Sequence, residues 1–166
     1  MLAHRPDDMS ELRVIAGELT EHMERLAASG GDIGPCHGDM QGGNANTTSD
    51  GVVNFYDFEY CGLGLRAYEI AVFFWGAALG VSRLGWDQPT VDHLWEAYLR
   101  GYEEARPLRA IDREAILPLV AARELWYLGI IAASWAHSGP PSDPDAVCDR
   151  ELRFLREWRA THRDGN

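Results

Sequence analysis

The sequence predicts a mainly helical α+β fold in a single domain. Its length of 166 residues is typical of one domain. Apolar residues recur at spacings of three and four over most of the chain, which is typical of amphipathic helices. Two β-prone runs separated by a turn occur in one short region, at residues 44–58. The predicted layout is one helix, a small β-hairpin between polar loops, and four further helices.

The first predicted helix covers residues 7–29. Leu12, Ile15 and Leu19 follow one another at helical spacing, and the Gly30-Gly31 pair ends the pattern. The next segment, residues 32–43, is dense in glycine and polar residues and is predicted to be a loop.

A β-hairpin is predicted directly after this loop. Residues 44–47 and 52–58 form the two expected strands, and Ser49, Asp50 and Gly51 supply the turn between them. The hairpin brings the residues at its two outer ends close together.

Four helices are predicted in the remainder. Residues 67–79 are nearly all apolar and should form a buried helix, and residues 90–105 are amphipathic. A long helix is expected over residues 112–137 with Asp112 as its N-cap, and an arginine- and glutamate-rich helix over residues 145–162. The most apolar part, residues 125–136, is about a dozen residues long and is predicted to be too short to span a bilayer.

Charge and composition exclude several classes of partner and chemistry. The net charge of −11 repels nucleic acid phosphates and anionic lipid, so we expect neither nucleic acid nor membrane as a partner. It favours a cationic small molecule or a metal ion. Every basic residue is arginine, because the chain contains no lysine. This absence excludes a P-loop lysine and Schiff-base chemistry.

The cysteine count and the first residues indicate the compartment. Three cysteines are few and odd in number, which is typical of free thiols in a reducing environment. The first dozen residues contain no apolar signal core. We therefore expect a cytoplasmic protein.

Three oxygen-bearing side chains surround the predicted hairpin. Asp39 lies in the loop beside Gly38, Asn44 begins the first strand, and Asp57 lies near the end of the second. Pairing of the strands should bring Asn44 and Asp57 together near the loop that carries Asp39. Two carboxylates and an amide oxygen are hard ligands that suit Mg²⁺, which completes its shell with phosphate oxygens and water.

The spacing of these residues resembles a known family. His37-Gly38-Asp39, then Asn44, then Asp57-Phe58-Glu59 are similar to the catalytic and metal loops of the aminoglycoside phosphotransferase and choline kinase superfamily, small-molecule relatives of the protein kinases. The resemblance is close over residues 34–75 and looser over the helical remainder. It implies that residues 1–166 form one kinase-like C-terminal lobe whose hairpin carries the catalytic and metal loops, with the N-terminal lobe absent.

The resemblance also implies roles for individual residues. Asp39 would accept or orient the proton of an attacking hydroxyl, while Asn44 and Asp57 would hold Mg²⁺ bridging the phosphates of ATP or another nucleoside triphosphate. Supporting roles fall to His37, which would brace the loop, and to Arg66 and Glu69, which would tie it to the next helix. The family more often has histidine at the position of Gln41 and aspartate at that of Glu69.

Further residues are candidates for substrate binding. Gln41 and Glu59 lie beside the implied catalytic and metal residues. Glu124 and Trp126 form a second candidate segment, because an aromatic ring and a carboxylate suit a cationic amine. The expected activity is therefore a Mg²⁺-dependent phosphotransferase acting on a hydroxyl of a small, amine-bearing metabolite.

Two alternatives remain open at this point. The chain can be a binding module for a small molecule or partner that no longer uses ATP, or an enzyme that reuses Asp39 together with Glu59 for other acid–base chemistry. In either case a single lobe would expose an apolar surface. That surface is expected to serve self-association or the docking of a separate N-terminal lobe.

Overall fold

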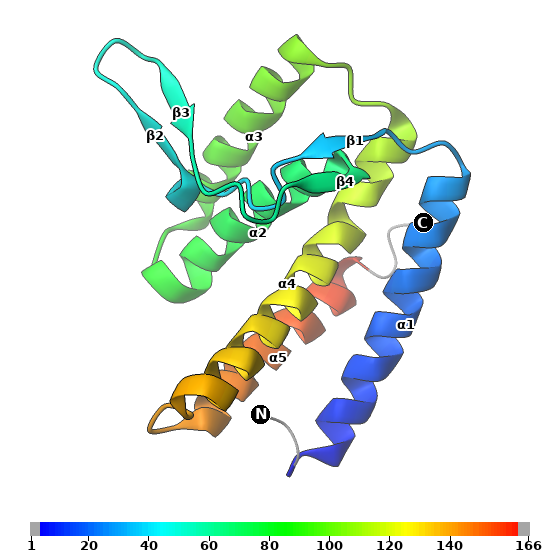
Figure 1. Ribbon diagram of the computed structural model, residues 1–166, viewed down its shortest axis with the longest axis vertical. Coiled ribbons are helices and arrows are strands. Elements are labelled where there is room, and N and C mark those ends of the chain that lie inside the picture. The colour runs from blue at the N-terminus through cyan, green and yellow to red at the C-terminus, as the bar shows by residue number, and fades with distance from the viewer. Residues whose placement is uncertain (1–3, 163–166) are drawn as a thin grey trace. The chain divides into compact units, whose positions relative to one another are not determined.

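The computed structural model describes residues 4–162, apart from the side chains of residues 82, 83, 158, 161 and 162. The predicted mainly helical α+β class is confirmed (Figure 1). Its helices are α1 (Pro6–Ala28), α2 (Ala67–Leu84), α3 (Gln88–Ala105), α4 (Ala110–Ser138) and α5 (Pro144–His162). The chain divides into two compact units, one of residues 25–120 and one that combines residues up to 24 with those from 121 onward. The prediction of a single domain stays a prediction.

The predicted hairpin is present, although its strands are shorter than expected. Strand β2 (Ala45–Thr47) pairs antiparallel with β3 (Val53–Phe55), and Asn46 lies opposite Asn54. A 3₁₀ turn, η1 (Gly42–Asn44), leads into β2. The second strand ends at Phe55 rather than residue 58, because Asp57 takes a left-handed backbone conformation with φ of 66°.

A second antiparallel pair was not predicted. Strand β1 (Ile33–Cys36) pairs with β4 (Gly62–Leu65), and Gly34 lies opposite Gly64. The prediction of a loop over residues 32–43 is therefore wrong for its first part. Glycine and proline are depleted in strands, so the sequences of β1 and β4 carry no strand pattern of their own. Pairing across almost 30 residues of chain creates them.

A network around Asp32 anchors this second pair. The Asp32 carbonyl accepts the Arg66 amide at 2.8 Å, and its carboxylate binds Arg66 Nη1 at 2.8 Å and Arg106 Nε at 2.6 Å. The Asp32 amide donates to the buried Asp112 side chain at 2.7 Å. The network therefore joins the start of β1 to the end of β4 and to the segment before α4.

Asp112 lies inside the first turn of α4 and is not its N-cap, so that prediction is wrong. Its carboxylate instead pairs with Arg109 Nε at 2.6 Å and accepts the Asp32 amide. Burial by itself would raise the pKa of Asp112, but the hydrogen bonds from Arg109 and from the Asp32 amide hold it below the ordinary value.

The core of unit 25–120 is centred on α2. As predicted, this helix is buried, with Ile70, Ala71 and Val72 fully inside. Its neighbour α3 contributes Tyr98, whose ring stacks on that of Phe73 with centroids 3.9 Å apart. Strand β3 and the turns beside it expose large apolar side chains, namely Val52, Val53, Phe55, Phe58 and, on β4, Leu63. Docking of a partner on them stays a prediction.

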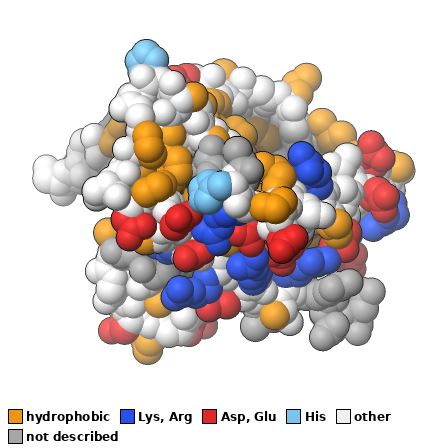
Figure 2. Space-filling view, turned by 90° about the horizontal axis from the view of Figure 1, so that it is seen from below, with side chains coloured by type: hydrophobic (Ala, Val, Ile, Leu, Met, Phe, Trp, Pro, Cys, Tyr) orange, Lys and Arg blue, Asp and Glu red, His pale blue; other side chains and the backbone are white. Residues whose placement is uncertain are grey.

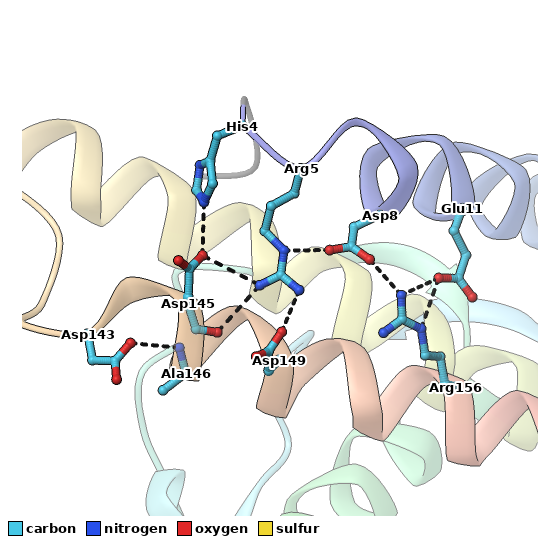
Figure 3. Close-up of polar contacts among 9 residues, drawn as sticks. All are labelled: His4, Arg5, Asp8, Glu11, Asp143, Asp145, Ala146, Asp149 and Arg156. Atoms are coloured by element: carbon cyan, nitrogen blue, oxygen red, sulfur yellow. Dashed lines mark hydrogen bonds and ion pairs between the residues drawn. The ribbon is translucent and has the colours of Figure 1, made fainter.

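In the other unit, apolar contacts and ion pairs join α1 to α5. The apolar cluster contains Leu12 of α1, Leu128 of α4 and Leu155 of α5. On the surface, Arg5 pairs with Asp8 of α1 and Asp149 of α5, and Arg156 of α5 pairs with Asp8 and Glu11 of α1 (Figure 3). Acidic and basic side chains are likewise interleaved on the face that Figure 2 shows. The excess negative charge is thus partly compensated locally.

Helix α4 is long and apolar enough to cross a membrane, judged by length and composition alone. This corrects the expectation that its apolar segment is too short. Of its most apolar stretch, 44% is buried within the protein. The core helix of a water-soluble protein can have the same length and apolar composition. The absence of a membrane partner stays a prediction.

Candidate active site

The outer end of the hairpin brings Asn44 and Asp57 to the same edge. The Tyr56 amide donates to the Asn44 carbonyl at 3.1 Å, so the pairing of β2 with β3 continues one residue beyond the strands. The Tyr56 hydroxyl also donates to the Gly43 carbonyl at 2.7 Å. Asp57 follows Tyr56 directly and therefore lies at the same end of the hairpin as Asn44, although neither residue is part of a strand as expected.

Asp39 and Asn44 are in direct contact. The Asn44 side chain is buried, and its Nδ2 donates to Asp39 Oδ2 at 2.7 Å and to the Asp39 carbonyl at 3.0 Å. Gln41 ends the loop by capping η1, since its side chain accepts the Gly43 amide at 3.1 Å. Hydrogen bonds thus connect the loop directly to the start of the hairpin.

Asp57 differs from the other two residues in its surroundings. It is exposed, and its carboxylate takes part in no hydrogen bond or ion pair within residues 4–162. A charged carboxylate in this position is available to a ligand from solvent.

His37 and Glu69 form hydrogen bonds with backbone groups of the loop that carries Asp39. The Asp39 amide donates to His37 Nδ1 at 3.3 Å, so His37 Nε2 carries the ring proton and donates to the Tyr56 carbonyl at 3.0 Å. The Gly38 amide donates to Glu69 Oε1 at 2.9 Å. These contacts join the loop to Tyr56 and to α2, and the bracing roles of His37 and Glu69 stay a prediction. Arg66 instead contacts the start of β1, through Asp32 and the Ile33 carbonyl.

Gly38 has to be glycine. Its φ of +83° is in the left-handed region, and a Cβ there would overlap the Tyr60 carbonyl oxygen. The position next to Asp39 is therefore restricted both by backbone conformation and by space.

A cavity of about 720 Å³ lies in the same unit as the loop. Among its lining residues are the predicted residues His37, Gln41 and Glu69. Sequence reasoning missed the aromatic residues Phe55, Phe73, Tyr98 and Tyr102, which also line it. The helical spacing of Phe73, Tyr98 and Tyr102 indicates only packed helix faces, Phe55 belongs to β3, and no signal in the sequence joins the hairpin to α2 and α3.

The remaining predicted substrate residues lie elsewhere. Glu59 is exposed, and its hydrogen bond with the Tyr60 side chain raises the pKa of that tyrosine. Glu124 and Trp126 belong to the other unit and do not line the cavity. Glu124 is fully buried, while the Trp126 ring lies 4.1 Å from the Arg123 guanidinium carbon.

Burial and negative charge both act on the groups around the cavity. Burial, reinforced by the Glu69 carboxylate, raises the pKa of the Cys36 thiol and of the Tyr98 hydroxyl. Both groups are therefore protonated at neutral pH. Cys36, Cys61 and Cys148 are all free, as expected from their number.

The donor set at the hairpin end fits a magnesium ion. The described residues contain no cluster of three or more His, Cys, Asp and Glu side chains that could hold a metal by themselves. The predicted site is of another kind, with an amide and two carboxylates supplying only oxygen. The exposed Asp57 carboxylate, at the same end of the hairpin as Asn44, would provide the charge that such an ion requires.

Comparison with known proteins gives a family and two relatives. The model of the phosphotransferase enzyme family matches residues 1–117. An uncharacterized protein of Deinococcus radiodurans is 35% identical over 162 residues, which cover 98% of this chain and 46% of the relative. An uncharacterized protein of Synechocystis sp. is 28% identical over 102 residues, or 61% of this chain and 24% of the relative. The chain thus spans less than half the length of these relatives. No solved structure matches significantly.

Proposed function

Because this chain belongs to the phosphotransferase enzyme family, we propose that its Asp39 loop transfers a phosphoryl group from a Mg²⁺-bound nucleoside triphosphate to a hydroxyl of a small molecule. We further propose that the chain corresponds to the C-terminal lobe of a kinase-like fold. The observation that carries the proposal is the contact of Asn44 Nδ2 with Asp39 Oδ2 at 2.7 Å, at the hairpin end that also bears Asp57.

Each residue of the site has a physical task in this proposal. Asp39 accepts the proton of the attacking hydroxyl, and Asn44 holds its carboxylate in place. Asn44 and Asp57 would hold Mg²⁺, which neutralises charge on the phosphates when bound. His37 and Glu69 fix the loop through the Tyr56 carbonyl and the Gly38 amide. The loop is therefore arranged before a ligand arrives.

Contacts to the nucleotide from outside these residues are part of the proposal. With no lysine in the chain, a cation that grips the phosphates must be an arginine or come from another polypeptide segment. We propose a kinase-like N-terminal lobe as the source, either in the remainder of a longer protein or in a partner.

Nucleotide binding to the 166-residue chain tests the proposal. Calorimetry should detect ADP only with Mg²⁺ present, and Asp57→Asn should weaken binding at least about tenfold because the metal loses a charged ligand. Asp39→Asn should retain binding but abolish transfer of the γ-phosphoryl group of ATP to water. Asp50→Asn, at the opposite end of the same hairpin, makes the same charge change as a control. Binding that depends neither on Mg²⁺ nor on Asp57 would overturn the proposal.

A further inference from the structure

The Tyr56 side chain joins the residues that precede the two proposed metal ligands. Its hydroxyl donates to the Gly43 carbonyl at 2.7 Å. Gly43 directly precedes Asn44 in the sequence, and Tyr56 directly precedes Asp57. One hydrogen bond therefore links the two backbone segments that carry Asn44 and Asp57.

This bond connects the segments where backbone pairing has stopped. The hairpin ladder extends as far as the bond from the Tyr56 amide to the Asn44 carbonyl, which is 3.1 Å long. One more step of the same register would set Gly43 opposite Asp57. The left-handed backbone of Asp57, with φ of 66°, ends the ladder before that step. The Tyr56 side chain reaches the Gly43 carbonyl, one residue beyond the last bond of the ladder, and so holds the two segments together there.

The backbone conformation of Asp57 depends on its neighbours in the chain. Within residues 4–162 its carboxylate takes part in no hydrogen bond or ion pair. A residue with a Cβ keeps a positive φ only where the surrounding structure restricts it. On one side Tyr56 is held by its amide, its hydroxyl and its carbonyl, which accepts His37 Nε2 at 3.0 Å. On the other side the centroid of the Phe58 ring lies 4.4 Å from that of the His37 ring.

The Tyr56 hydroxyl affects geometry more than stability. Tyr56 is 44% exposed, and a hydrogen bond in contact with solvent is replaced by one to water at little net cost. Loss of the hydroxyl should therefore change the free energy of unfolding only slightly. Water, however, does not hold the Gly43 carbonyl at a fixed distance from Tyr56, so the separation of Asn44 and Asp57 would vary.

We propose that the Tyr56 hydroxyl is a positioning group for a divalent cation site, holding Asn44 and Asp57 at the spacing that a single ion requires. The inference rests on the proposed function for the identity of the two ligands, but it does not require that nucleotide binds there. Loss of groups that orient metal ligands typically lowers metal affinity about 10–100-fold. Tyr56 is neither the base nor a ligand in this arrangement.

Mn²⁺ tests the inference without nucleotide and without turnover. This ion takes the same oxygen ligands as Mg²⁺, and electron paramagnetic resonance of the free ion measures its affinity for the 166-residue chain. Tyr56→Phe keeps the ring and the backbone bonds but removes the hydroxyl, so we expect at least about tenfold weaker Mn²⁺ binding. Asp57→Asn should also weaken binding. Adding Tyr56→Phe to Asp57→Asn should weaken it little further, because alignment matters only while both ligands are present.

Thr48→Val is the matched control, because it removes a hydroxyl at the opposite end of the same hairpin. Thr48 Oγ1 donates to the Val52 carbonyl at 3.1 Å. The control should lower the urea midpoint of unfolding at least as much as Tyr56→Phe and leave Mn²⁺ affinity unchanged. Circular dichroism of each variant checks that the fold is retained.

Three results would overturn the inference. The first is unchanged Mn²⁺ affinity in folded Tyr56→Phe. The second is an equal loss of affinity in Thr48→Val, which would show that stability of the hairpin, and not the position of the ligands, is what the hydroxyl supplies. The third is failure of the parent chain to bind Mn²⁺.

Failure of this inference and failure of the proposed function give different results. Mn²⁺ binding that requires the Tyr56 hydroxyl, without any Mg²⁺-dependent binding of ADP, would support the positioning role and contradict phosphoryl transfer. Mg²⁺-dependent binding of ADP that is equal in the parent and in Tyr56→Phe would support the phosphotransferase and contradict the role of Tyr56.

Discussion

Asn44 donates one hydrogen bond to the Asp39 carboxylate and another to the Asp39 carbonyl, at 2.7 and 3.0 Å. One buried amide therefore fixes both the backbone and the side chain of the residue proposed as the base. Since Asn44 precedes β2 directly, the position of Asp39 depends on correct pairing of the hairpin.

Placing a second carboxylate at position 44 should destabilise the protein in a pH-dependent way. Asn44→Asp brings a like charge against Asp39, which raises the pKa of one of the two carboxyls. We expect a loss of about 2–3 kcal/mol at pH 7 that shrinks toward pH 4 as one group becomes protonated. Urea unfolding at the two pH values measures it. The exposed hairpin residue Asn54 supplies the control variant Asn54→Asp, and a loss as large in that variant would contradict the argument.

Alanine variants of two glycines should distinguish the cost of backbone strain from the cost of steric overlap. Gly38 and Gly51 have φ values of +83° and +86°, but only Gly38 has a neighbouring atom where a Cβ would be placed. Gly51→Ala should cost about 1 kcal/mol from its left-handed backbone alone. Gly38→Ala should cost about 3 kcal/mol, because Tyr60 must also move. Denaturant midpoints of both variants give the comparison, and equal losses would show that the Tyr60 carbonyl does not restrict the loop.

Asp32 should contribute stability at neutral pH that is lost in acid. The hydrogen bond from Arg106, followed by the charges of Arg106 and Arg66, holds the pKa of Asp32 below its ordinary value. The stabilisation is therefore complete above the unfolded-state pKa of about 3.9 and disappears as the pH falls through the lower folded-state pKa.

Asp32→Asn should accordingly cost about 1–2 kcal/mol at pH 7 and progressively less below pH of about 4. Urea unfolding across this range measures the difference from the parent. Glu96→Gln, at an exposed position of α3, is the matched control and should show no such trend. A penalty for Asp32→Asn that is constant with pH would show that its ion pairs do not stabilise the fold.

The ion pairs between α1 and α5 should be weak and sensitive to salt. Arg156 Nη2 lies 2.6 Å from Asp8 Oδ1 and 2.6 Å from Glu11 Oε2, yet 43% of the Arg156 side chain is exposed (Figure 3). We expect Arg156→Gln to cost at most about 1 kcal/mol at low ionic strength and almost nothing at about 1 M salt. Thermal unfolding at the two salt concentrations tests this, with Arg153→Gln on the same helix as control.

The helices were predictable because each carries its own periodicity. The buried face of α2 follows from the apolar run at residues 67–79, and the hairpin follows from its turn at Asp50-Gly51. Strands β1 and β4 were not predictable, since Gly34 and Gly64 give no local signal and meet only through long-range pairing. The role of Asp112 was not predictable either, because the Asp32 amide that its carboxylate binds lies 80 residues away in the sequence.

The candidate site was predictable only in part, for the same reason. Asp39, Asn44 and Asp57 lie close together in the sequence, so the contact of Asn44 with Asp39 and the position of Asp57 at the same hairpin end follow from one hairpin. The aromatic wall of the cavity comes from Phe73 and Tyr98 on two different helices. The contact of the Glu69 carboxylate with the Gly38 amide depends on where α2 begins relative to the loop, which spacing alone does not reveal.

Asp57 holds a conformation in which an L-residue with a Cβ is strained by about 1–2 kcal/mol, and glycine is not. Exchange of this aspartate for glycine would therefore relax the backbone while removing the carboxylate from the hairpin end. Selection for thermal stability and selection for the proposed metal binding would therefore act in opposite directions at this residue. A screen for heat resistance alone would be expected to enrich glycine there, and we expect the recovered variants to lack the carboxylate that the proposed magnesium site requires.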